Sequence, residues 1–324
     1  MTTPRQPLVS VIVPTYNYGQ YIADALESIL AQTVRDFEVV VVDDGSTDNT
    51  REVVARFTDP RVRLLSKENG GTGSARNLGR REARGAFIAW LDADDLWKPV
   101  YLERMLGVLE GEPELGHCFA NFVRTEHGKL LPGTQFDYVP RLWQLPTRSA
   151  RGSAARVIDM DPFAALAPST SLPGWLQASL FRRAALEGRW SDPRPTAAED
   201  LYLILQVYAG GMPIAFLDEV LVEVRRHGKN SYPTGDHIQN AVLQTVLAVR
   251  AQVPLTASQH RILRRRIGAE YCALGWRSFW RHDAGKAAGF YGRALLWPGK
   301  RLPALAHLAL LPVLPLLPRR EPSF

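Results

Sequence analysis

Four short apolar runs alternate with helix-like segments over the first hundred residues, and this alternation limits the fold more than any other feature. The runs span residues 8–13, 37–42, 62–65 and 87–91. Between them, apolar residues recur at the spacing of a helix. Strands that are apolar on both faces and are joined by helices favour a parallel, doubly wound sheet. The sequence therefore predicts an α/β unit of four strands and three helices.

Polar residues follow three of these runs at the point where each predicted strand ends. Pro14–Asn17 follow the first run, which Pro14 is expected to terminate. Asp43 and Asp44 follow the second run, and Asp92–Asp95 follow the fourth. In sheets of this kind, ligands bind beyond the carboxyl ends of the strands. Loops alone do not readily account for three polar clusters at one edge, so we expect a ligand site there.

Three carboxylates fall within four residues at the end of the fourth run. Asp92, Asp94 and Asp95 repel one another at neutral pH unless a cation lies among them. Carboxylate oxygens suit hard ions such as Mg²⁺ and Mn²⁺, which also bridge phosphate oxygens. The alternative is a polar strand end that caps a helix near Pro99. The neighbouring polar clusters favour a metal site.

The other two clusters are less specific when each is taken alone. Asp44 can accept the imide N–H of a uracil or thymine base or hold a ribose hydroxyl, but Asp, Gly and Ser are also common in turns and helix caps. Pro14 and Tyr16 offer a rigid turn and an aromatic face for a base, or they simply end a strand.

Taken together and in order, the motifs resemble those of the family 2 glycosyltransferases, which have the GT-A fold. Their order and spacing match the family, and the resemblance covers residues 8–232. The motifs are Val9–Asn17 (VSVIVPTYN), Asp43–Asp48 (DDGSTD), Gly73–Asn77 (GSARN), Leu91–Asp95 (LDADD), Glu199-Asp200 and Arg225–Ser231 (RRHGKNS). The resemblance implies an α/β fold with a Rossmann-like nucleotide-binding half (residues 8–98), an acceptor and catalytic half (99–232) and a mixed central sheet.

The resemblance also implies inverting transfer from a nucleoside-diphosphate sugar, with roles for particular residues. Pro14 and Tyr16 would lie at the base, and the Tyr16 ring would stack near it. Asp44 would bind the base, and Arg76 would hold either Asp44 or the nucleotide. Asp92 would lie near the ribose and diphosphate.

Three further residues receive roles in metal binding and catalysis. By the resemblance, Asp94 ligates Mn²⁺ or Mg²⁺ and Asp200 is the base that deprotonates the acceptor hydroxyl. His227 would be a further metal or diphosphate ligand. The plainer alternatives are that Asp200 only begins a helix over residues 201–208, where acids favour the positive end, and that His227 is a surface histidine among basic residues.

The remaining sequence is less constrained by motifs. Residues 132–173 are rich in Pro, Ser and Arg and predict a long loop, whereas residues 214–224 predict a strand. From Asp236 to the end, a basic extension predicts helices over residues 238–253, 258–281 and 284–296. It carries 13 Lys and Arg against 4 Asp and Glu, while the preceding residues carry 26 against 29.

The end of the extension is strongly apolar. Residues 302–318 contain four prolines and are too short and too interrupted to predict a transmembrane helix. They predict either an interfacial anchor or a helix packed on the protein. Two distant cysteines and a short polar start predict neither a disulfide framework nor a signal peptide, which favours the cytoplasm. The basic charge of the extension predicts either a peripheral contact with an anionic membrane or an ordinary solvated helix surface.

Other function classes fit the sequence less well. Gly71–Arg76 lack the third glycine of a dinucleotide loop and follow the third strand, and no aromatic-basic RNA motif accompanies the basic extension. A non-catalytic protein that binds nucleotide sugars is the main alternative, and Asp94, Asp200 and His227 argue against it. We therefore expect a donor sugar on UDP, a glycan or lipid-linked acceptor in cell-surface polysaccharide or glycoconjugate synthesis, and no nucleic acid.

Overall fold

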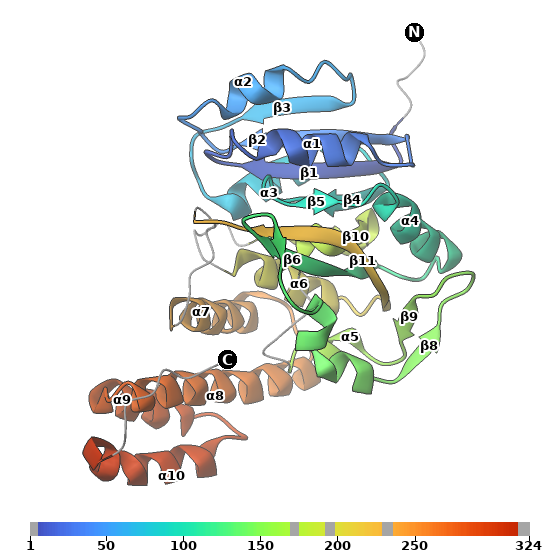
Figure 1. Ribbon diagram of the computed structural model, residues 1–324. Helices are drawn as coiled ribbons and strands as arrows, with labels where there is room; N and C mark the ends of the chain where they lie inside the picture. Colours follow the sequence, from blue (N-terminus) through green and yellow to red (C-terminus); the bar gives the residue numbers. More distant parts are fainter. Residues whose placement is uncertain (1–5, 169–174, 192–197, 229–235, 317–324) are drawn as a thin grey trace.

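One mixed sheet runs through the computed structural model and is flanked by helices on both faces (Figure 1). The structure describes residues 6–168, 175–191, 198–228 and 236–316. The strands follow the order β3-β2-β1-β4-β10-β6-β11-β9-β8, with β5 beside β11 and β7 beside β6. The predicted α/β class with a mixed central sheet and a helical C-terminal segment is confirmed.

The first part of the chain has the predicted alternation of four strands and three helices. Its strands β3-β2-β1-β4 are parallel neighbours. Their alternate residues pack into two apolar clusters, with Ile12 and Val40 in one and Val11 and Val39 in the other. The elements are β1 (Val9–Thr15), α1 (Ile22–Leu30), β2 (Phe37–Asp43), α2 (Thr50–Ala55), β3 (Val62–Ser66), α3 (Thr72–Glu82) and β4 (Phe87–Trp90).

Strand β1 does not end at Pro14, contrary to the prediction. Pro14 is buried within the strand and pairs with Val42 of β2. On its other side, the pairing of β1 with β4 ends at Ile12 and Trp90. A proline can be accommodated there because this side of β1 no longer needs a backbone N–H for the ladder.

The second part of the chain makes the sheet mixed. Strand β10 (Ser179–Arg182) lies antiparallel to both β4 and β6 (His117–Glu126), and β11 (Ile214–Arg226) lies parallel to β6. It follows that β6 and β11 point the same way as β4. The short strand β5 (Leu96–Trp97) pairs with β11, which holds the Asp92–Asp95 turn against the end of β11.

The predicted loop over residues 132–173 is more ordered than expected where it is described. It contains two 3₁₀ turns, the hairpin β8-β9 and a short helix that Asp161 caps through its side chain. The remaining elements of this part are α4 (Tyr101–Gly111), β7 (Lys129–Leu130), η1 (Gln135–Tyr138), η2 (Pro140–Gln144), β8 (Thr147–Ser149), β9 (Arg156–Ile158), α5 (Pro162–Leu166), η3 (Leu176–Ala178), η4 (Arg183–Leu186) and α6 (Glu199–Ala209).

The C-terminal helices pack below the second half of the sheet in Figure 1. They are α7 (Asp236–Gln252), α8 (Ala257–Trp280), α9 (Ala284–Ala294) and α10 (Arg301–Leu310), followed by η5 (Leu311–Leu316). The three predicted helices are confirmed, and the apolar end adds α10 as a helix packed on the protein. Among the described residues, no helix combines the length and the apolar character needed to cross a membrane. The domain boundaries 8–232 and 236–324 stay predictions.

Candidate functional site

The carboxyl ends of β1, β2, β4, β6 and β11 meet at one edge of the sheet, because these strands all point the same way. This edge carries the residues after β1, β2 and β4 that the sequence singles out. It also carries His227, which directly follows β11. The site is therefore assembled from strand ends that are far apart in the sequence, as expected for such sheets.

Asp44, at the end of β2, is held by the loop that follows β3. Its buried carboxylate accepts the N–H of Gly70 at 3.1 Å and of Gly71 at 2.7 Å, and it is paired with the Lys67 ammonium. Gly71 is the N-cap of α3, so Asp44 lies at the positive end of that helix. The chain thus fixes the orientation of this carboxylate before any ligand binds.

The loops after β1 and β2 are tied to each other by their own polar groups. The Asn17 side chain accepts the N–H of Thr47 at 2.8 Å, and the Asn17 N–H donates to Ser46 Oγ at 2.9 Å. Asp43 is buried and is used within its own turn, where it accepts the Ser46 N–H at 3.0 Å and pairs with Arg51. Asp43 therefore supports the turn, whereas Asp44 faces the loop after β3.

Tyr16 and Pro14 differ in their exposure at the end of β1. The Tyr16 side chain is 43% exposed, which leaves its ring accessible to a ligand. Pro14 is buried in the strand and does not form the ligand-facing turn that the sequence predicts. Of the two residues, only Tyr16 presents a surface on which a base could stack.

Arg76 connects the β4 end to the start of α6. Its guanidinium donates to Asp92 Oδ1 at 2.9 Å and to Glu199 Oε1 at 3.0 Å, and only 7% of the side chain is exposed. Burial opposes the charge, but Asp92 and Glu199 outweigh it and raise the pKa of Arg76. Arg76 binds these two carboxylates rather than Asp44, which was one of its two predicted partners.

Asp94 and His227 meet at the same edge. His227 Nε2 lies 3.0 Å from Asp94 Oδ2, and each side chain is 10% exposed. Burial and the nearby Asp92 raise the pKa of Asp94, while His227 opposes the rise. The ring of Tyr21 stacks on the His227 imidazole with centroids 4.2 Å apart and an interplanar angle of 18°. His227 is thus fixed from two sides, by a ring and by a carboxylate.

Asp95 has a structural role in the same turn. Its buried carboxylate accepts the backbone N–H of Arg225 at 3.0 Å, and the Arg225 guanidinium returns a bond to the Asp94 carbonyl. Burial, with Asp94 and Asp92, raises the pKa of Asp95 well above its usual value. These bonds hold the end of β11 against the Asp92–Asp95 turn, and so they bring His227 to Asp94.

Asp200 lies in the first turn of α6, next to the Glu199 that Arg76 binds. Burial and the Glu199 charge raise the pKa of Asp200 to about 7, and Arg76 opposes the rise. A carboxylate with a pKa near 7 can take a proton from a hydroxyl group and release it again at neutral pH. The local helix signal explains where Asp200 lies, but it does not explain the raised pKa of this carboxyl.

The donor atoms at Asp94 and His227 fit a divalent cation that also binds phosphate. A carboxylate oxygen and an imidazole nitrogen suit Mn²⁺, and ions of this class are commonly held by one or two protein ligands plus phosphate oxygens. Within the described ranges, no group of three or more His, Cys, Asp or Glu side chains is arranged to hold a metal by itself. The metal roles of Asp94 and His227 stay predictions.

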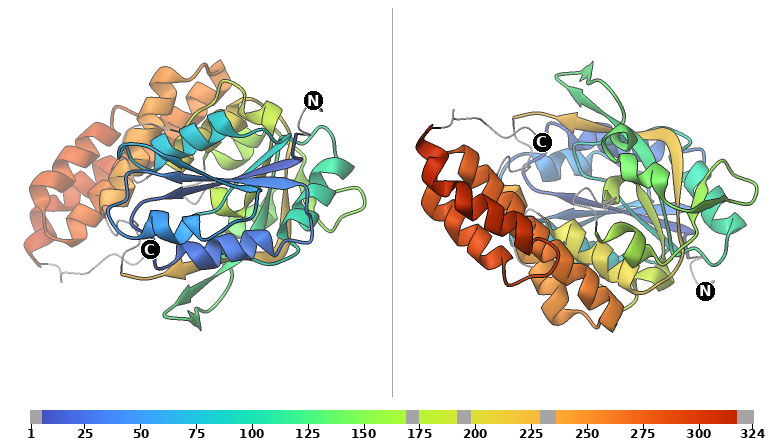
Figure 2. Two further views of the ribbon diagram at one scale, coloured as in Figure 1. Left: turned by 90° about the horizontal axis from the view of Figure 1, so that it is seen from above. Right: turned by 90° about the horizontal axis from the view of Figure 1, so that it is seen from below.

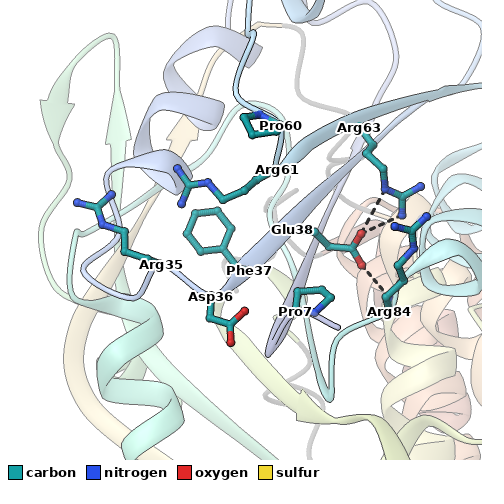
Figure 3. Close-up of a pocket in the computed structure, with 9 residues that line it drawn as sticks. All are labelled: Pro7, Arg35, Asp36, Phe37, Glu38, Pro60, Arg61, Arg63 and Arg84. Carbon is teal, nitrogen blue, oxygen red and sulfur yellow. Dashed lines mark hydrogen bonds and ion pairs between the residues drawn. The ribbon is translucent and has the colours of Figure 1, made fainter. Parts of the chain in front are cut away.

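A separate pocket lies at the opposite edge of the sheet (Figure 3). Its lining residues come from the segments that lead into β1, β2, β3 and β4, away from the carboxyl ends of these strands. Glu38 is buried there and binds Arg63 at 2.9 Å and the N–H of Arg84 at 2.7 Å. The lining consists of Pro7, Arg35, Asp36, Phe37, Glu38, Pro60, Arg61, Arg63 and Arg84. This pocket is not part of the candidate site.

Four residues of the site had no role in the sequence prediction. Lys67 follows β3 at the ligand edge, so the rule that singled out the other strand ends could have found it. Glu199 and Arg225 lie inside recognised motifs, but their contacts need the folded structure. Tyr21 gave no signal, because its partner His227 comes from β11 at the far end of the domain.

Comparison with known sequences agrees with this geometry. Residues 10–160 match the family described as Glycosyl transferase family 2. An uncharacterized glycosyltransferase of Nostoc sp. is 42% identical over 111 residues, which cover 33% of this chain and 34% of that protein. The hyaluronan synthase of Pasteurella multocida is 47% identical over 104 residues, which cover 32% of this chain and 11% of that protein. The chain thus spans about a third or less of the curated relatives it matches.

Solved structures resemble almost the whole chain. Residues 1–349 of Staphylococcus aureus TarS, in complex with UDP, superpose with a TM-score of 0.63 at 21% identity, covering 94% of this chain and 85% of that one. A mannosyltransferase of Pyrobaculum calidifontis, in complex with GDP-Man and Mn²⁺, gives 0.58 at 22% identity, covering 97% and 82%. At such identities the likeness shows the fold. The sequence matches place residues 10–160 in family 2 of the glycosyltransferases, and the structural likeness shows that the chain has the GT-A fold.

Proposed function

We propose that this protein transfers a sugar from a nucleoside-diphosphate sugar to an acceptor hydroxyl, with inversion at the anomeric carbon. The observation that carries the proposal is the Arg76 bridge, which joins Asp92 beside the predicted metal ligand to the helix start that holds Asp200. The bridge joins donor-side and acceptor-side carboxylates through one buried guanidinium, that of Arg76. A transferase needs this arrangement, because the leaving diphosphate and the attacking hydroxyl lie on opposite sides of the sugar.

Asp44 and Tyr16 form the base side of the proposed donor site. An ionised carboxylate has about four lone-pair positions. Among the described residues, Lys67, Gly70 and Gly71 supply three donors to Asp44, and the Gly70 N–H is shared between both oxygens. An imide N–H would join the Gly71 N–H at Oδ2, which receives no ammonium from these residues. Uracil carries such a group, which makes a UDP-sugar our first choice. The S. aureus TarS structures with UDP and UDP-GlcNAc support a nucleotide-sugar donor, as does the GDP-Man complex of the archaeal enzyme.

Asp94 and His227 would hold Mn²⁺ or Mg²⁺. The cation, when bound, neutralises charge that develops on the diphosphate leaving group. Asp94 is suited to this role because a nearby cation would offset the burial and the Asp92 charge that raise its pKa. Tyr21 keeps the His227 ring in place, and Asp92 remains partly exposed towards the ribose and diphosphate side.

Asp200 would act as the general base. It accepts the proton of the acceptor hydroxyl as the oxygen attacks the anomeric carbon from the face opposite the diphosphate, and the product is inverted. General base catalysis contributes roughly 10²–10⁴-fold. Arg76 holds Glu199, and so it fixes the first turn of α6 relative to the donor side.

The acceptor that we propose is a glycan or a lipid-linked molecule. Relatives named hyaluronan synthase and chondroitin synthase support cell-surface polysaccharide or glycoconjugate synthesis. We place the reaction in the cytoplasm, at the inner face of a membrane. The alternative, a protein that binds the nucleotide sugar without reacting it, predicts donor binding and no turnover with any acceptor.

The Asp200→Asn variant tests the proposal. We expect it to bind UDP-sugar and Mn²⁺ like the wild-type protein in a thermal-shift assay, while release of UDP falls by roughly 10²–10⁴-fold. Excess chelator should stop turnover of the wild type, and Mn²⁺ should restore it. The exposed substitution Glu187→Gln, with the same change in charge, is the control. Near-full turnover by Asp200→Asn would refute the base, and full turnover in chelator would refute the metal.

A further inference from the structure

Helix α10 is apolar on two opposite sides. Its inner side packs on α8 and α9, where Ala304 is fully buried and the His307 ring stacks on Tyr291 with centroids 5.0 Å apart. At 3.6 residues per turn, a second stripe faces the other way. This outer stripe consists of Leu302, Leu305, Ala306, Ala309 and Leu310, all of which are exposed. A helix that is apolar all round is normally buried, so the outer stripe lacks a partner in the isolated chain.

The exposure of this stripe is large. Leu302 is 80% exposed, Leu305 51% and Leu310 46%. Single exposed leucines are ordinary, but several on one short helix form a patch of the kind that marks an interaction site. We call these three leucines the leucine face.

Cations border the leucine face and the local sequence supplies no counter-charge. Arg293, Lys300 and Arg301 are exposed in the last turn of α9 and at the start of α10. Residues 284–318 contain no Asp or Glu. The partner of this surface must therefore combine an apolar interior with negative charge at its boundary.

The leucine face lies on the outermost layer of the molecule. In Figure 1, α10 is the helix farthest from β1, β2 and β3, and in the right view of Figure 2 it lies in front of α8 and α9. In either view, no described element lies beyond α10 on the side away from α8 and α9. A flat, extended partner could therefore reach the whole face without meeting the rest of the domain.

We propose that α10 lies in the plane of an anionic lipid bilayer, with the leucine face in the acyl boundary and Arg293, Lys300 and Arg301 at the headgroups. A helix of 10 residues cannot span a bilayer but can lie in its interface. A second copy of this chain is a poorer partner, because it would bring the cations of both chains together. This inference rests on the proposed function, because it assumes the lipid-linked acceptor. It adds that the enzyme meets this acceptor at the membrane on which α10 lies.

Flotation of the full chain with vesicles tests the proposal. We expect binding to vesicles that contain phosphatidylglycerol and weak binding to phosphatidylcholine alone. Leu302→Gln/Leu305→Gln should lower the affinity at least about tenfold. Lys300→Gln/Arg301→Gln should lower it about fivefold per cation, and high salt should have a similar effect.

Matched control variants distinguish an effect of the α10 surface from a general effect of lower apolarity or lower charge. Leu64→Gln/Leu130→Gln removes two exposed leucines elsewhere, and Arg56→Gln/Arg81→Gln removes two exposed cations from the nucleotide half. Both should float like the wild type. Equal binding by the α10 variants would overturn the proposal. So would the absence of vesicle binding together with a wild-type oligomer that Leu302→Gln/Leu305→Gln dissociates, because a second copy would then cover the face.

Hydrolysis of the sugar donor in solution distinguishes this inference from the proposed function. The α10 variants should keep the wild-type rate of donor hydrolysis, which also shows that they are folded. A chain that floats but turns over no donor leaves the membrane surface standing and refutes the transferase. A chain that turns over donor but does not float refutes the membrane surface and leaves the transferase standing.

Discussion

The ends of β2 and β4 both carry adjacent carboxylates, yet the groups that surround these carboxylates differ. At the β2 end, Asp43 and Asp44 are compensated by donors of the chain itself, namely Arg51, Lys67 and the backbone N–H groups before α3. At the β4 end, Asp94 and Asp95 are buried beside Asp92, and their pKa values are raised.

This difference separates two kinds of binding. A carboxylate that is already oriented and compensated is suited to a neutral hydrogen-bond donor such as a base, because no charge has to be neutralised on binding. Carboxylates whose charges are mutually unfavourable are suited to a cation, which relieves both the repulsion and the burial. Under the proposed function, the β2 end would therefore bind the base of the donor and the β4 end its diphosphate.

Between the two strand ends, the largest effect should come from replacing one carboxylate at each end. We expect Asp94→Asn to lower kcat by about 10²–10³, because it weakens the cation that stabilises the leaving group. Asp44→Asn should instead raise the donor KM by about tenfold or more with a smaller change in kcat, because it loses a charge-assisted hydrogen bond to the base. Steady-state kinetics over a range of Mn²⁺ and donor concentrations would show the split. Equal losses of kcat in both variants would contradict the division.

The sequence predicted where these residues lie better than it predicted their contacts. Strand ends such as Asp44 and Asp92 were predictable, because apolar periodicity locates the strands and parallel strands share an edge. The continuation of β1 through Pro14 was not predictable, because it depends on where the pairing with β4 stops. The Asp94–His227 contact follows from the family motifs, but the bonds of Asp95 to Arg225 that produce it required the structure.

The second prediction concerns Asp200, which joins the β4 network through Glu199 and Arg76. Since the base must be ionised, kcat/KM should rise about tenfold per pH unit below pH 7 and level off above its pKa of about 7. Arg76 lowers that pKa. In folded Arg76→Gln protein, the rise of kcat/KM with pH should therefore extend to higher pH. A pH–rate profile for both proteins is the measurement. An unmoved limb would show that Arg76 does not act on the base.

The same pKa has a consequence for stability with a defined sign. Because burial raises the folded-state pKa of Asp200 from 3.8, the protonated carboxyl favours the folded state at low pH, and this advantage is lost as pH rises through about 7. Asp200→Asn stays neutral, so its thermal unfolding temperature should exceed that of the wild type above pH 7. An Asp200→Asn variant that is less stable than the wild type above pH 7 would mean that folding does not raise the pKa of Asp200.

The smallest effect should come from Tyr21, whose ring contacts the β4 end indirectly, through His227 and Arg225. Removing the stacked ring in Tyr21→Leu frees the imidazole, and we expect the apparent affinity for Mn²⁺ to fall about tenfold, as for other residues that orient a metal ligand. Tyr21→Phe keeps the ring and should behave like the wild type, and neither variant should change the donor affinity that depends on Asp44. Titration of activity with Mn²⁺ at saturating donor measures the effect. If Tyr21→Leu instead raised the donor KM at saturating Mn²⁺, Tyr21 would belong to the base side, and the division between the two strand ends would have to be redrawn.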